Sequence, residues 1–222
     1  MVVQIMPLAG ADIPTYVRVE LEAFRSHPRI SMLWPNGYTD DLYAYYEAGK
    51  TKSFHEPDTR FIKAVDDTMG EILGVSEVTF ALDLAKNAAR SPPSTDEQPP
   101  ANWPAGGNWE LKRYFKINTF HLLADSFTGK PYILVDLLIV NPKYHRQGIG
   151  SKLLDYATNE ADQRGVLLGL ESTPAGLSLY HRHGLREAQV IKADMRLFGV
   201  MHEYDEEAAK RVWMVREPRM QT

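Results

Sequence analysis

Apolar and polar residues follow two different periods along the chain, and the first half alternates between them. β-branched and aromatic residues are enriched in segments 2–6, 61–65 and 72–80, which predict strands. A polar turn at 66–70 joins the last two segments, so we expect them to form an antiparallel hairpin. Strands and helices are therefore expected in mixed order, as in an α+β arrangement.

Apolar residues at helical spacing predict three helices that flank these strands. The first begins after Asp12, which can cap it, and His27-Pro28 stops it. The other two are expected at 40–50 and 111–123.

The most apolar segment of the chain is 131–140. Its nearly continuous run of Ile, Leu and Val predicts a strand that is buried on both faces at the centre of a sheet. The spacing of apolar residues after it predicts a helix that ends at Gly165, followed by a second buried strand at 166–170.

The last quarter of the chain predicts shorter elements. Ser172 or Thr173 can cap a short helix that has Pro174 in its first turn. Two further strands are expected around 190–197 and 212–215.

Residues 86–108 differ in composition, since Ser, Pro, Ala, Asn and Gly dominate and cannot continue a strand or helix. We interpret this segment as a Pro-rich loop inserted in one domain that spans 1–222. Trp103 and Trp109 within or beside it either anchor the loop to the surface or form a wall of a substrate pocket.

The composition is that of a soluble globular protein. The chain has 222 residues, of which 44% are hydrophobic and 24% charged, and this length suits one substantial core. No segment is long and apolar enough to cross a bilayer, and residues 1–7 lack the features of a secretory signal. We therefore expect a cytoplasmic protein without a membrane partner.

Cysteine content and net charge exclude several classes of function. Without any cysteine, the chain has no disulfide, no thiolate zinc site and no cysteine nucleophile. The net charge of −4 and the lack of a basic stripe argue against nucleic acid and weakly favour a cationic small substrate. His181 and His183 point to different sides of a helix, so no metal site is expected.

A glycine turn follows the central strand and opens the next helix, at His145-Arg146-Gln147-Gly148-Ile149-Gly150. Glycine allows close approach to a ligand, and the first amides of a helix can bind phosphate. The order Ile149-Gly150-Ser151-Lys152 does not fit a P-loop, and Leu153 occupies the third glycine position of a dinucleotide fold. Both nucleotide folds are therefore disfavoured.

The turn resembles the signature of the GNAT superfamily of N-acetyltransferases, a strand followed by Gln/Arg-x-x-Gly-x-Gly/Ala and a helix, with His145 in the first position. A second stretch, 170–185, resembles the superfamily's strand and helix that end in Leu-Tyr-x-x-x-Gly-Phe. Tyr180 is the tyrosine of this pattern, and Leu185 stands in the position of its final phenylalanine. Thr173 stands where relatives often have an asparagine that touches the cofactor.

The resemblance implies an α/β fold of GNAT type, with a mixed, mostly antiparallel sheet flanked by helices and with central strands that splay apart. It implies acetyl-CoA as cosubstrate, with main-chain amides of the glycine turn on the pyrophosphate and the backbone of Leu138 and Val140 on the pantetheine and thioester. The expected cofactor-binding residues are Leu138, Ile139, Val140, His145, Arg146, Gln147, Gly148, Ile149, Gly150, Ser151 and Thr173.

Two residues are candidates for catalysis. Acetyl transfer needs a neutral amine, and Asp136 on the central strand matches the position of a base or water-holding group in several GNAT enzymes. The resemblance implies Tyr180 as the acid that protonates the leaving thiolate. Alternatively, Asp136 lies at an open strand end or pairs with an arginine, and Tyr180 is a buried tyrosine bonded to backbone.

The function expected from these residues is transfer of an acetyl group from acetyl-CoA to a primary amine, of a small molecule rather than a protein, directly in a ternary complex. Glu20 and Glu22 on the first helix either attract the amine or form a solvated face. A non-catalytic acyl-CoA sensor and a protein or peptide N-acetyltransferase are the alternatives. The chain is expected to be a monomer or a homodimer.

Overall fold

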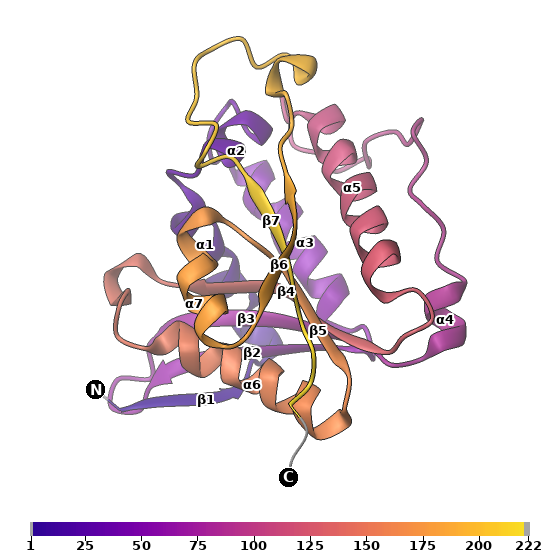
Figure 1. Ribbon diagram of the computed structural model, residues 1–222. Coiled ribbons are helices and arrows are strands. Elements are labelled where there is room, and N and C mark those ends of the chain that lie inside the picture. The colour runs from indigo at the N-terminus through magenta and orange to yellow at the C-terminus, as the bar shows by residue number, and fades with distance from the viewer. Residues whose placement is uncertain (1, 220–222) are drawn as a thin grey trace.

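The computed structural model describes residues 2–219. Its strands form one seven-stranded sheet in the order β1-β2-β3-β4-β5-β7-β6 (Figure 1). All neighbours are antiparallel except β4 and β5, which are parallel. The predicted α/β fold with a mostly antiparallel sheet is confirmed. The strands are β1 Val3–Pro7, β2 Thr59–Asp66, β3 Ile72–Ala81, β4 Tyr132–Val140, β5 Leu167–Ser172, β6 Arg186–Ile191 and β7 Arg211–Arg216.

Helices cover both faces of this sheet. Figure 1 shows α6 and α7 in front of it and α3 behind it. The helices are α1 Ile13–Phe24, α2 Pro28–Leu33, α3 Asp40–Phe54, α4 Leu84–Ala88, α5 Trp109–Phe127, α6 Ile149–Arg164 and α7 Leu177–Arg182. Within residues 2–219, no helix combines the length and the apolar character that a membrane crossing requires.

Each face of the sheet has its own core, because each helix turns an apolar stripe towards it. Tyr16 of α1 and Leu42 of α3 pack on Val75 of β3 in the cluster on one face. On the other face, Leu154 and Ala157 belong to α6 and lie in a cluster with β4, β5 and β7.

A β-bulge interrupts the pairing of β3 with β4. Glu77 lies opposite Leu137, whereas Val78 lies opposite Val135, so Asp136 is the extra residue of β4. A bulge bends its strand and redirects the side chain of the extra residue.

The parallel strands β4 and β5 separate where the bulge occurs. Their pairing runs from Tyr132 opposite Leu167 to Val135 opposite Leu170 and ends there, although both strands continue. The prediction of splayed central strands is confirmed. Backbone groups of β4 beyond Val135 that face β5 have no strand partner on that side.

One local prediction was wrong. The strand expected at 190–197 lies at Arg186–Ile191, and a short 3-10 helix follows at Met195–Phe198. The first five residues of β6 are exposed at the edge of the sheet, so their polar sequence gave no strand signal. α1 ends at Phe24, before His27 and Pro28, and these two residues also start the next helix, because the His27 side chain caps α2 and Pro28 begins it.

The Pro-rich insertion contains α4 at its start and has no other helix or strand before α5. The Trp103 ring lies 4.8 Å from the Trp34 ring and 4.9 Å from the Trp109 ring, measured between centroids. Trp34 itself is buried in the core. These contacts support the interpretation of both tryptophans as anchors of the loop.

A buried ion pair connects β7 to α6. Arg216 donates two hydrogen bonds to the Asp162 carboxylate, at 2.7 and 2.6 Å, and only 3% of the Arg216 side chain is exposed. These bonds lower the pKa of Asp162.

Asp162→Ala is expected to destabilise the protein by about 3 kcal/mol, because Arg216 loses its counter-charge while it stays buried. Glu160→Ala on the same helix removes an exposed pair with Arg164 and is the control, with an expected loss of about 0.5 kcal/mol. Urea unfolding measures both. Since the pKa of Asp162 is lowered in the folded state, its contribution is present above the unfolded pKa and is lost as the pH falls through the folded one. Equal losses for the two variants would contradict this account.

Candidate active site

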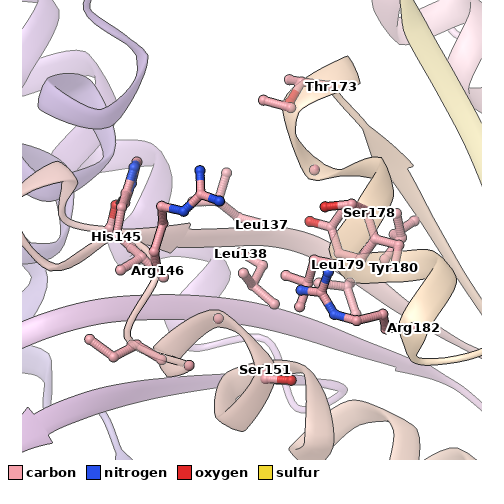
Figure 2. A pocket seen from close by; sticks show the side chains of 18 of the residues that line it. Leu137, Leu138, His145, Arg146, Ser151, Thr173, Ser178, Leu179, Tyr180 and Arg182 are labelled. Carbon is pink, nitrogen blue, oxygen red and sulfur yellow. Dashed lines mark hydrogen bonds between the residues drawn. The ribbon is translucent and has the colours of Figure 1, made fainter.

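A cavity of about 730 Å³ occupies the space between the diverging ends of β4 and β5. β4, the loop after it, the start of α6 and the segment from Glu171 to Arg182 line it (Figure 2). Because only a short loop with a 3-10 helix at Pro142–Tyr144 separates β4 from the glycine turn, local sequence brings the strand edge and the helix start to the same wall.

The structure brings eleven of the thirteen predicted site residues to this cavity. Ile139 does not line it, because its side chain is buried in the core beside α1 and α3, and Gln147 is exposed outside it. The predicted residues that line the cavity are Asp136, Leu138, Val140, His145, Arg146, Gly148, Ile149, Gly150, Ser151, Thr173 and Tyr180.

The glycine turn presents the start of α6 to the cavity. Gly148 is the N-cap and has a φ of 78°, a conformation that favours glycine. Arg146 has a φ of 64°, the only positive value for a non-glycine residue between 2 and 219. The amides of Ile149, Gly150 and Ser151 form the first turn of the helix and have no partners within it. This turn can bind an anion.

Two arginines add positive charge at the same place. Figure 2 shows Arg146 entering from the loop after β4 and Arg182 entering from α7, on opposite sides of the cavity. Arg146 was predicted from its position in the turn. Arg182 was missed, because only the packing of α7 beside α6 brings it close to the glycines.

His145 and Ser151 each bond to the protein itself. The imidazole Nε2 of His145 lies 2.9 Å from the carbonyl oxygen of Val140, the last residue of β4. Ser151 Oγ lies 2.5 Å from Nε2 of His183, and the other ring nitrogen of His183 lies 3.3 Å from Asp155. His145 therefore supports the end of the strand, and His183 fixes the hydroxyl of Ser151.

Asp136 lies in the bulge, and its side chain is exposed to the cavity that the protein walls enclose. Its carboxylate accepts a hydrogen bond of 2.6 Å from the Thr79 hydroxyl and pairs with no arginine within residues 2–219. Burial and the charge of Glu77 raise the pKa of Asp136 to about 7, against the opposing effect of Thr79. A carboxyl with this pKa can accept a proton at neutral pH.

Glu77, the neighbour of Asp136, belongs to a buried network below the cavity. Its carboxylate accepts a hydrogen bond of 2.7 Å from Lys50, which also lies 3.4 Å from Glu20. Glu20 is thus held by Lys50, and Glu22 pairs with Arg25 on the surface. Neither glutamate of α1 lines the cavity.

Tyr180 lies on α7 with 8% of its surface exposed, and it reaches the cavity wall. A Cβ at Gly176 would lie 2.7 Å from the Tyr180 ring, so the ring needs a glycine at that position. Burial alone raises the pKa of Tyr180 to about 12, and the hydroxyl makes no backbone hydrogen bond within the described chain. The phenol therefore stays protonated and available as a donor.

A second cavity, of about 480 Å³, adjoins the first. Phe24 and Glu171 line both, so they mark the junction. Glu171 accepts hydrogen bonds from Arg29, at 3.0 Å, and from Arg211, and these cations lower its pKa. Glu171 is therefore a structural anion at the junction of the two cavities, and sequence reasoning missed it because its partners are distant in the chain.

The second cavity, between α2 and α5, receives residues from the Pro-rich insertion. Arg90 and Pro93 of the insertion line it, whereas Trp103 and Trp109 do not. The insertion therefore helps to close the cavity, although its tryptophans take no part.

The model for the GNAT acetyltransferase domain matches residues 117–187, which include β4, α6, β5 and α7. A search of curated protein sequences gives no match.

Solved structures of acetyltransferases match nearly the whole chain. A Corynebacterium glutamicum protein described as histone acetyltransferase HPA2 and related acetyltransferase has a TM-score of 0.62 and 20% identity, with 100% of this chain and 99% of that chain covered. Arylalkylamine N-acetyltransferase 2 from Aedes aegypti has a TM-score of 0.66 and 13% identity, with 98% and 99% covered. The ribosomal-protein-S18-alanine N-acetyltransferase from Escherichia coli has a TM-score of 0.56 and 15% identity, with 100% and 97% covered.

The structural matches establish the fold, and the family model covers the segment that builds the cavity wall. Residues 117–187 therefore match the GNAT acetyltransferase domain, and the chain as a whole has the fold of these N-acetyltransferases.

Proposed function

We propose that the protein transfers an acetyl group from acetyl-CoA to a primary amine of a small molecule, directly in a ternary complex. The observation that carries this proposal is the cavity between β4 and β5, into which a helix start, a raised-pKa carboxyl and a protonated phenol all open. Acetyl-CoA supplies the acetyl group as a thioester.

The residues of the first cavity fit coenzyme A. The free amides at the start of α6, with Arg146 and Arg182 on either side, suit a pyrophosphate. The edge of β4 beyond Val135 has no strand partner, and its backbone at Leu138 suits the amides of a pantetheine arm and can polarise a carbonyl, whereas the Val140 carbonyl is already bonded to His145. Thr173 lines the opposite wall, on the segment after β5.

Asp136 takes the proton from the amine, directly or through a water molecule. An alkyl ammonium has a pKa of about 10, so a base assists formation of the neutral nucleophile at neutral pH. With a pKa of about 7, the Asp136 carboxyl is partly ionised under these conditions. Thr79 holds the carboxylate in place by its hydrogen bond.

Tyr180 donates a hydrogen bond to the departing sulfur. An alkyl thiol has a pKa of about 8.5, whereas the pKa of Tyr180 is about 12, so its complete ionisation opposite a thiolate is unfavourable. The phenol is therefore suited to stabilise, by its hydrogen bond, the negative charge that develops on the sulfur. It is less suited to give up its proton completely to the thiolate.

The second cavity is the site proposed for the acceptor. It meets the first at Phe24 and Glu171, so an amine within it approaches the thioester from the side opposite to α6. Its walls come from α2, α5 and the insertion, and its volume of about 480 Å³ suits a small molecule.

Thiol release from acetyl-CoA, measured across small primary amines and a lysine peptide, tests the proposal. Turnover with a small amine is expected, and Tyr180→Phe is expected to lower kcat by about 100-fold without changing the affinity for coenzyme A. Tyr156→Phe, a change on α6 outside the cavity, is the control. Coenzyme A binding without any thiol release would instead support a sensor, and an unchanged kcat in Tyr180→Phe would refute its role.

The pH dependence of kcat/KM tests the role of Asp136. Activity should rise with pH through a value near 7, because the ionised carboxylate is the active form. Thr79→Val removes a bond that favours ionisation and should move the rise to higher pH, whereas Thr59→Val keeps the bond and should not. Asp136→Asn should lose the rise together with most of the activity. A profile that is identical in Thr79→Val and the wild type would contradict this assignment.

A further inference from the structure

The second cavity is rich in positive charge. Five cationic side chains and a single carboxylate, that of Glu171, line it. Glu171 is already held between Arg29 and Arg211. The cations are Arg29, Arg90, Lys112, Lys116 and Arg211. This local excess of positive charge is opposite in sign to the net charge of the chain, which is −4.

Lys112 differs from the other four cations, since it has no ion-pair or hydrogen-bond partner within residues 2–219. Lys116 pairs with Glu97, and Arg90 donates to the Tyr132 hydroxyl. Glu20 attracts Lys112 from α1 but is itself paired with Lys50. Burial lowers the pKa of the Lys112 ammonium, the charges of Lys50, Lys116 and Arg211 add to this effect, and Glu20 opposes it.

Other donors around the cavity also lack acceptors. Nε of Arg29, Nη1 of Arg211 and Nε2 of His27 are buried without a hydrogen-bond partner. The Nδ1 atom of His27 accepts from the Arg29 amide, and burial lowers the pKa of His27 to about 4, so the neutral ring carries its proton on Nε2. The walls therefore offer more donors than acceptors.

Apolar side chains form much of the remaining surface of the cavity. On α5, Phe115, Phe120 and Leu123 follow Lys112 at helical spacing and line the same wall, beside Thr119, whose hydroxyl accepts a hydrogen bond from Arg211. Ile30 and Leu33 of α2 and Phe24 of α1 lie across from them. A ligand that fits has an apolar body and one group that accepts hydrogen bonds and carries negative charge.

We infer that the acceptor is an amine that also carries a carboxylate on an apolar body, and that the Lys112 ammonium binds this carboxylate. The inference rests on the proposed function, because it places the acceptor in the second cavity. A carboxylate supplies Lys112 with its counter-charge and offers two acceptor atoms. Amino acids with aromatic or branched side chains have this chemistry.

The same charges act on the amino group of the acceptor. Nearby cations repel an ammonium and lower its pKa, which favours the neutral form that attacks the thioester. They also disfavour an acceptor with several positive charges and no anion. A polyamine such as spermidine is therefore expected to be a poor substrate.

Binding of carboxylates that lack an amine tests the inference without any turnover. Calorimetric titration of the coenzyme A complex with 3-phenylpropionate and 4-methylpentanoate should show binding to the wild type, weakened about tenfold or more in Lys112→Met. Arg113→Met, which removes a cation of the same helix that does not line the cavity, is the matched control and should change binding by less than about threefold. Lys112→Arg keeps the charge and should retain most of the affinity, and a thermal melt of each variant verifies that it is folded.

Turnover then separates this inference from the proposed function. Phenylalanine should have a higher kcat/KM than phenethylamine, and Lys112→Met should remove that preference by lowering kcat/KM for phenylalanine alone. Turnover of phenethylamine with equal or greater efficiency, unchanged by Lys112→Met, would overturn the inference and leave the acetyltransferase function intact. Failure of both carboxylates to bind the wild type, or equal binding to Lys112→Met, would also overturn the inference. Carboxylate binding without thiol release from any amine would support Lys112 as the anion site and count against the function.

Discussion

The separation of β4 from β5 is the constraint on which the rest of the site depends. Two parallel strands that stay paired along their length leave no room for a ligand between them, whereas here the pairing ends at Val135 and Leu170. The bulge at Asp136 bends β4 at the same position and points a carboxylate into the gap. Because only a short loop separates β4 from the glycine turn, the divergence also places the start of α6 beside the strand edge that has no partner.

The two cavities near this divergence differ in the charges that line them. Main-chain amides and two arginines make the first cavity suited to a polyanion, and unpaired donors make the second suited to a carboxylate. The raised pKa of Asp136 arises at the boundary, where burial and Glu77 oppose ionisation. A negative net charge therefore says little about the ligand, since the charges that face a cavity are a small and unrepresentative part of the total.

Local sequence predicted the features that are encoded by neighbouring residues. The glycine turn, the buried strand before it and Tyr180 on its short helix lie in two continuous stretches, so their spacing was sufficient to identify them. Arg182, Glu171 and Lys112 could not be found in this way, because tertiary packing brings them to a cavity wall. The exposed edge strand β6 was misplaced for a related reason, since it buries too little to show a pattern.

Amide protection in the glycine turn tests the central claim most directly, that the divergence of β4 from β5 seats coenzyme A with its pyrophosphate on the start of α6. Residue-resolved hydrogen exchange by NMR would compare coenzyme A with pantetheine, which lacks the pyrophosphate. The account predicts that coenzyme A slows exchange at Ile149, Gly150 and Ser151, whereas pantetheine leaves these amides unchanged. Equal exchange with both ligands, or protection at the start of another helix, would contradict it.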